Sequence, residues 1–273
     1  MKCRFWDMSW KEAQEAFRKS DTVIIPVGTL HGHGPTPISI DSSSVEKLAD
    51  EVGKRTGMVV MPLVAYGENE KMKLYPGSIA IRPETLERLY TDICRELHRN
   101  GIKKIIFLNG HGGNREAIMK AGRNVRELGV IIAIVEWWSI GKKLMPELWP
   151  EPKGSYMSEL AVAIAIGGKE IADLRGEGYR GEWGSNPTLR KIFGEEIKPL
   201  GFNDFEYKGA QIMIPIDAWE IDVDSPPKVT TKELDALERR GQEIIRRLAD
   251  YVADFAKEFQ KVRIPETSSP QHD

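Results

Sequence analysis

Residues 22–28 read TVIIPVG, an apolar run rich in isoleucine and valine, and segments of this kind decide the fold. Their polar and apolar residues do not alternate strictly, which is typical of strands covered on both faces. Three further runs have the same character. The predicted strands therefore span residues 22–28, 58–64, 104–109 and 130–135.

Helical patterns stand between and after these strands. The clearest helical pattern begins near Pro83, a residue typical of a first turn, and ends at Asn100-Gly101, a pair typical of a helix end. The predicted helices span residues 42–55, 84–99, 114–128 and 232–260. Alternating strands and helices indicate βαβ crossovers, so we predict an α/β, single-domain layered fold with a mostly parallel central sheet flanked by helices. We expect one domain over 1–264, a disordered tail at 265–273, and long loops at 141–157 and 175–215.

The composition argues against several classes of partner. The 273 residues carry 39 basic and 41 acidic side chains, a net charge of −2, which gives no electrostatic reason to expect nucleic acid or a membrane surface. Cys3 and Cys94 are far apart in the sequence, which favours two reduced thiols. The first 17 residues lack the apolar segment of a signal peptide, and the run 160–166 is too short to span a bilayer. We expect a cytoplasmic protein.

Three of the five histidines directly follow predicted strands. His31 and His33 lie in LHGHGPTPISID (30–41), which ends at Asp41, and His111 lies in NGHGGN (109–114). Because the carboxyl ends of parallel strands share one edge of a sheet, these side chains should converge there. Imidazole and carboxylate are the usual ligands of zinc and similar ions, so the pattern predicts a metal site that Asp41 could bridge. A lone histidine in a glycine-rich loop is more often a surface residue, but two such loops favour ligands.

The motifs resemble those of the creatininase family of metal-dependent amidohydrolases. PVGTLHGHGP (26–35) is similar to the family's P-x-G-S-x-E-Q-H-G-P, and Asp41 stands where the family has an aspartate. YPGSIAIRPETL (75–86) matches the family's P-G-T segment, and NGHGGN is the second family motif unaltered. The third, approximately H-A-G-x-x-E-T-S, is similar to GSYMSELA (154–161). The first three matches cover most of residues 20–128.

The resemblance implies a layered α/β fold and a two-metal site. It assigns metal ligands to His33, His111 and the bridging Asp41, and Glu159 keeps the glutamate of the third motif. His31 replaces a glutamate ligand of the family, with Gly32 in place of the usual glutamine. Two further departures are Gly113, where creatininase has a glutamate ligand, and Gly154, where the third motif has a histidine.

The expected metal set is therefore His31, His33, Asp41, His111 and Glu159. Three neutral donors and two carboxylates carry less negative charge than the family's usual set. Imidazole-rich sites favour zinc, iron or cobalt over magnesium or calcium. We expect one or two divalent ions per chain, with manganese also a candidate.

The catalytic expectation is metal-assisted hydrolysis, with Glu159 and His111 as the catalytic residues. Glu159 is either a ligand or the group that moves the proton. Trp137 and Trp138 could form walls of a small pocket, with core packing as the alternative for one of them. Glu136 and Asn114, which lies near a helix N-terminus, complete the expected substrate pocket.

The predicted function is opening of a small polar cyclic substrate, at a C–N amide bond. The alternatives are opening of a carbocyclic, inositol-derived diketone at a C–C bond, and a metal-binding homologue without catalytic activity. The resemblance also implies a homo-oligomer, since family members commonly form hexamers or other closed assemblies.

Overall fold

A computed structural model describes residues 2–73, 75–149, 154–174, 196–199, 204–215 and 229–264. Its helices are α1 (Trp10–Lys19), α2 (Ile40–Thr56), α3 (Pro83–Arg99), α4 (Asn114–Asn124), α5 (Trp137–Leu144), α6 (Gly154–Gly167) and α8 (Leu234–Gln260). Its strands are β1 (Thr22–Val27), β2 (Val59–Val60), β3 (Lys104–Asn109), β4 (Ile131–Glu136), β5 (Ile197–Pro199), β6 (Asp204–Tyr207) and β7 (Ala210–Met213). Short 3-10 turns include η2 (Glu70–Met72), η3 (Arg126–Leu128) and η7 (Thr231–Glu233).

The central sheet has the order β2-β1-β3-β4, and every pair in it is parallel. All residues of β1 and β3 are buried, which explains why their sequences show no polar alternation. The predicted parallel sheet flanked by helices is therefore confirmed.

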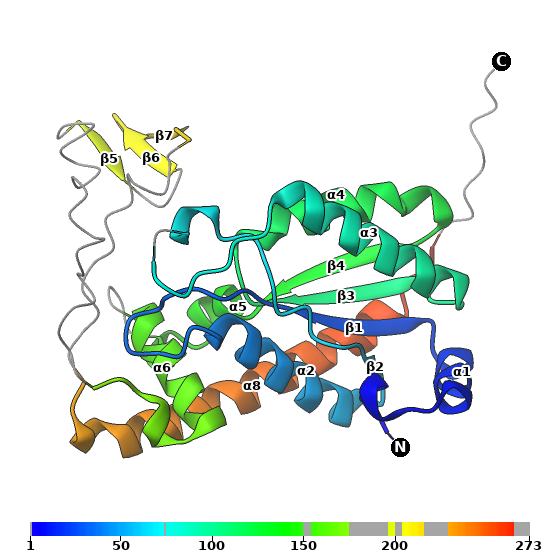
Figure 1. The fold of residues 1–273 in the computed structure, drawn as a ribbon, viewed down its shortest axis with the longest axis horizontal. Coiled ribbons are helices and arrows are strands. Elements are labelled where there is room, and N and C mark those ends of the chain that lie inside the picture. Colours follow the sequence, from blue (N-terminus) through cyan, green and yellow to red (C-terminus); the bar gives the residue numbers. More distant parts are fainter. Residues whose placement is uncertain are drawn as a thin grey trace.

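The two faces of the sheet pack against different helices (Figure 1). Val23, Ile25 and Val27 point to the face covered by α3 and α4. Ile24 points to the opposite face, where α2, α6 and α8 lie. Because successive side chains of a strand alternate between faces, six-residue strands are enough to serve two hydrophobic cores.

The predicted strand over 58–64 is shorter in the structure. Only Val59–Val60 forms β2, although Met61 and Val64 still donate backbone hydrogen bonds to Ile24 and Pro26 of β1. Ile24 pairs with Val60 but Val27 pairs with Val64, so one extra residue lies between these contacts and breaks the regular pairing. The strand predicted at 104–109 appears as β3. The helices predicted at 84–99, 114–128 and 232–260 appear as α3, α4 and α8, with ends that differ by a few residues.

Several elements were not predicted. Helix α1 begins with a capping box in which Ser9 and Glu12 bond each other's backbone amides. Helices α5 and α6 occupy part of the stretch expected as a loop at 141–157, and the antiparallel sheet β5-β6-β7 lies within the one expected at 175–215. The predicted disordered tail, 265–273, lies outside the described residues. Among the described helices, none combines the length and apolar character that a membrane crossing requires.

Candidate metal centre

The parallel strands β1, β3 and β4 end side by side, so the loops that follow them lie at the same edge of the sheet. Val27 of β1 pairs with Asn109 of β3, which pairs with Glu136 of β4. In Figure 1 the arrowheads of β3 and β4 point to the side where α5 and α6 lie. The loop with His31 and His33 follows β1, and the loop with His111 follows β3. The carboxyl edge of the sheet therefore gathers the histidines, as expected for this fold class.

Glycines let the start of α2 approach this edge closely. A Cβ atom on Gly110 would lie 1.9 Å from the backbone oxygen of Asp41, and one on Gly28 would lie 2.3 Å from Oγ of Ser42. Neither position could carry a side chain without displacing α2. The missing side chains thus allow the first turn of α2 to present Asp41 between the loops after β1 and β3.

The side chains of Asn109 and Asn114 form hydrogen bonds to the loops at this edge of the sheet. Nδ2 of Asn114 donates to the backbone oxygen of Gly28 at 3.0 Å and to Oδ1 of Asn109 at 3.2 Å, while its Oδ1 accepts from the backbone amide of Glu68 at 2.9 Å. Oδ1 of Asn109 also accepts from the backbone amide of His111 at 3.2 Å. Asn114 has no exposed surface, and these contacts use its amide to position the site.

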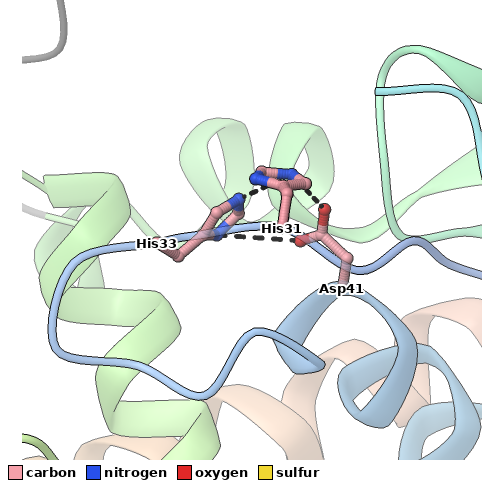
Figure 2. Close-up of side chains that lie close together, drawn as sticks. All are labelled: His31, His33 and Asp41. Atoms are coloured by element: carbon pink, nitrogen blue, oxygen red, sulfur yellow. Dashed lines mark hydrogen bonds and ion pairs between the residues drawn. The ribbon is translucent and has the colours of Figure 1, made fainter. Parts of the chain in front are cut away.

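His31, His33 and Asp41 converge tightly (Figure 2). Nε2 of His31 lies 2.9 Å from Nε2 of His33 and 3.1 Å from Oδ2 of Asp41, and Nδ1 of His33 lies 3.8 Å from Oδ1 of Asp41. His31 and Asp41 are buried, whereas His33 is partly exposed. One ligand atom from each of the three residues lies within 4.8 Å of the others.

His111 and Glu159 extend the cluster on two sides. Nδ1 of His111 lies 2.9 Å from Oδ2 of Asp41 and 3.2 Å from Nε2 of His31. Oε2 of Glu159, on α6, lies 3.1 Å from Nδ1 of His33. All five residues predicted as ligands therefore lie in one contiguous cluster, built from the ends of two strands and the helices α2 and α6.

The donor set fits a divalent cation. Nε2 of His31 faces three potential ligand atoms, from His33, Asp41 and His111, at 2.9 to 3.2 Å. A ring nitrogen carries at most one proton, so these contacts cannot all be good hydrogen bonds. Several lone pairs directed at one point are the arrangement that a cation with nitrogen and oxygen ligands requires. Imidazoles and carboxylates of this cluster would hold such an ion.

The charges of the cluster are strongly coupled. Burial lowers the pKa of His31, which favours the neutral, ligand-competent imidazole. Burial alone would also lower the pKa of His33, but the negative charges of Asp41 and Glu159 outweigh it and raise that pKa to about 9. Burial works against the charged form of Asp41 too, yet His33 and the contacts from His111 and His31 hold the pKa of this carboxyl well below its usual range.

The predicted pocket residues lie in different environments. Trp137 is 2% exposed and packs edge-on against Trp149, with ring centroids 5.5 Å apart, so core packing accounts for its position. Trp138 is partly buried and approaches Gly112 in the His111 loop. The carboxylate of Glu136 is held by Arg115 at 2.6 and 2.9 Å and by Asn109 at 3.3 Å.

Glu68 is a residue near the centre that was not predicted. Its carboxylate lies against Gly113, where a Cβ atom would be 2.0 Å from Oε2 of Glu68. The only signal in the sequence was an acidic stretch, GENE (67–70), which stands far from the histidine motifs and matches no metal-binding pattern.

Comparison with known proteins agrees with this geometry. The family model described as "Creatininase: Creatinine amidohydrolase" matches residues 6–161. The chain belongs to the creatininase family. The creatinine amidohydrolase of Pseudomonas putida is 29% identical over 161 residues, which cover 53% of this chain and 62% of that protein. The 3-dehydro-scyllo-inosose hydrolase of Thermotoga maritima is 31% identical over 110 residues, 40% of this chain and 35% of that protein.

A third relative is the mycofactocin precursor peptide peptidase of Mycolicibacterium smegmatis, 35% identical over 106 residues, 36% of this chain and 42% of that protein. The chain therefore matches less than two thirds of the length of these curated relatives. A crystal structure of creatininase superposes with a TM-score of 0.71 at 20% identity, covering 96% of this chain and 99% of the other. Creatininase structures of the same fold include a manganese form and a variant of Zn-Zn type.

Proposed function

We propose that the protein is a metal-dependent hydrolase that opens a small polar cyclic substrate at a C–N amide bond. The observation that carries the proposal is the convergence of His31, His33, Asp41, His111 and Glu159 at the carboxyl edge of the sheet. The match to the creatininase family model supports an amidohydrolase.

A bound divalent ion supplies Lewis-acid chemistry, because it acidifies a water molecule and polarises the carbonyl group under attack. The chain's own residues supply the ligands of the ion and the group that moves the proton. Asp41 contacts both His31 and His111, so its carboxylate would hold a metal ion together with these imidazoles. His31, whose pKa is lowered by burial, offers a neutral nitrogen.

Glu159 is placed to move a proton. It lies at the edge of the cluster, its side chain 14% exposed, with Oε2 against Nδ1 of His33. A carboxylate beside the reacting atoms can take a proton from water and pass it to the leaving nitrogen. In the metal-free protein the raised pKa of His33 keeps a proton on that ring near neutral pH, and a bound ion would displace it.

The donor set favours zinc, iron, cobalt or manganese, bound as one or two ions. Three imidazoles favour borderline-soft metals, and two carboxylates allow manganese. The zinc and manganese forms of structurally similar creatininases support these two metals.

A second candidate reaction is opening of a carbocyclic diketone at a C–C bond. The relative that favours it is the 3-dehydro-scyllo-inosose hydrolase of Thermotoga maritima, 31% identical over 110 residues. Lewis-acid polarisation of a ring carbonyl would serve this reaction equally well.

The test is a hydrolysis assay of metal-free protein and of protein reconstituted with zinc or manganese. Creatinine and related cyclic amides form one substrate panel, and cyclic diketones the other. We expect metal-dependent turnover on one panel and its loss in Asp41→Asn. Asp50→Asn, on the same helix but beside Arg4 at the surface, is the matched control. Turnover that survives metal removal or the Asp41 substitution would contradict the proposal.

A further inference from the structure

Asn109 and Glu136 end two neighbouring strands and lie side by side. They are the last residues of β3 and β4, and the parallel register pairs them directly. Because side chains alternate between the two faces of a strand, Asn109 follows Ile105 and Phe107 onto the face covered by α3 and α4. The first turn of α4 carries Arg115 to the same place. An amide, a carboxylate and a guanidinium therefore meet at the carboxyl edge of the sheet.

The carboxylate of Glu136 joins a cation on one side and a buried amide on the other. Its Oε1 accepts from Nε of Arg115 at 2.9 Å and from Nδ2 of Asn109 at 3.3 Å, and its Oε2 accepts from Nη2 of Arg115 at 2.6 Å. The side chain of Glu136 is 13% exposed, whereas that of Arg115 is 59% exposed. A two-point contact with a guanidinium has a fixed geometry, so Arg115 holds the Glu136 carboxylate in one orientation.

The amide of Asn109 has one orientation that satisfies its neighbours. Its Oδ1 accepts from the backbone amide of His111 at 3.2 Å, and a backbone N–H can only donate. An ionised carboxylate can only accept, so Glu136 requires Nδ2 of Asn109 on its own side. Rotating the amide by half a turn would place Nδ2 against the His111 N–H and Oδ1 against the Glu136 carboxylate. Asn109 has no exposed surface, so bulk water does not replace either contact.

We propose that Glu136 is a positioning residue of the metal centre, which fixes the amide of Asn109 and, through it, the start of the His111 loop. From this loop the ring of His111 reaches Asp41, with Nδ1 2.9 Å from Oδ2. Hydrogen-bond partners that orient a ligand contribute to metal affinity although they do not touch the ion. The inference rests on the proposed function, because it assigns His111 to a metal ligand set. It gives Glu136 a task inside the protein.

Three substitutions of Glu136 separate the reach of the side chain from its charge. Glu136→Ala removes the acceptor. Glu136→Asp keeps the charge, but its carboxylate is one methylene too short to contact Asn109 while it pairs with Arg115. Glu136→Gln loses the charge but keeps Oε1, the atom that accepts from both neighbours. The control is Glu116→Ala, because the exposed carboxylate of Glu116 pairs with Lys120 on the same helix, α4.

The experiment measures hydrogen exchange of the His111 backbone amide by NMR in the metal-free full chain, and Zn²⁺ affinity by competition with a chelator. We expect Glu136→Ala and Glu136→Asp to exchange the His111 amide about tenfold faster, because the local contact that protects it is lost. The same two variants should bind Zn²⁺ about tenfold more weakly, the lower end of the usual effect of losing an orienting partner. Glu136→Gln and Glu116→Ala should stay close to the wild type in both measurements.

The two readouts separate positioning from a general structural effect. Circular dichroism checks folding, and if Glu136→Ala does not fold, Glu136→Asp decides. Unchanged His111 exchange in the folded variants would overturn the inference, as would faster exchange with unchanged Zn²⁺ affinity. Losses in Glu136→Gln as large as those in Glu136→Asp would overturn it too, since charge and not reach would then matter. Wild type that binds no Zn²⁺ would instead overturn the proposed function, whereas exchange in metal-free protein tests the Glu136 contact independently.

Discussion

His31 and His33 face each other with their Nε2 atoms 2.9 Å apart, and both rings also contact Asp41. One of the two facing nitrogens must carry a proton for this contact to be a hydrogen bond, and Nδ1 of His33 needs a second proton to donate to Glu159, so the two contacts together favour a positively charged His33. In the metal-free protein the proton on His33 supplies that charge, because Asp41 and Glu159 overcome burial and raise the pKa of His33 to about 9. A divalent cation would take over the role of this proton.

Metal affinity should therefore depend on pH. The ion must displace the proton of His33, so the apparent affinity for Zn²⁺ should rise by about tenfold per pH unit between pH 7 and 9 and level off above. Competition titrations with a chelator of known affinity measure this slope. The His33→Gln variant should bind more weakly and with a flatter slope; a wild-type affinity independent of pH in this range would count against the assignment.

The stability of metal-free protein should fall over the same pH range. The folded-state pKa of His33, about 9, lies above its unfolded value of about 6.5, so the stabilisation is complete below pH 6.5 and disappears as the pH rises through 9. The lowered pKa of His31 has no effect there, since that ring is neutral in both states above pH 7. Thermal unfolding from pH 7 to 9.5 measures the loss, which His33→Gln should lack.

Gly113→Ala should destabilise the protein although its backbone conformation suits alanine. The new methyl group would meet Oε2 and the backbone oxygen of Glu68 at 2.0 and 2.5 Å. Displacing that loop should cost about 1–3 kcal/mol of unfolding free energy. Gly112→Ala is the matched control, because its Cβ atom would have only Trp138 near it, at 4.0 Å. Equal denaturation midpoints for the two variants would show that the loop with Glu68 moves aside without a loss of unfolding free energy.

His31→Glu should change which metals the centre prefers. A buried carboxylate in place of the imidazole adds a negative charge and a hard oxygen ligand, so the ratio of Mn²⁺ to Zn²⁺ affinity should rise. Metal should also remain bound at lower pH, since a carboxylate protonates near 4.3 and a free imidazole near 6.5. Metal content against pH, compared with His31→Ala, checks both points. Superimposable curves for the three proteins would mean that His31 is not a ligand.

The sequence predicted the sheet and the convergence of histidines because both depend on local signals. Apolar runs such as 104–109 mark buried parallel strands, and histidines placed directly after them must lie at one edge. Helix α1 was missed because only Ala13 of its residues is buried, so it has no wide apolar face, and the Ser-x-x-Glu pattern at Ser9 and Glu12 was its main signal. Trp137 could not be assigned to core or pocket, since its partner Trp149 is distant in sequence. Glu68 lies against Gly113 through a loop whose path depends on tertiary contacts, which periodicity does not report.

The central claim is that the cluster around Asp41 binds a divalent metal ion. A crystal structure of zinc-reconstituted protein, with anomalous diffraction recorded at the zinc edge, tests it most directly. We expect an anomalous peak about 2.0–2.3 Å from ring nitrogens of His31, His33 or His111 and from a carboxylate oxygen of Asp41. A structure with fully loaded protein and no peak within ligand distance of Asp41 would contradict the account.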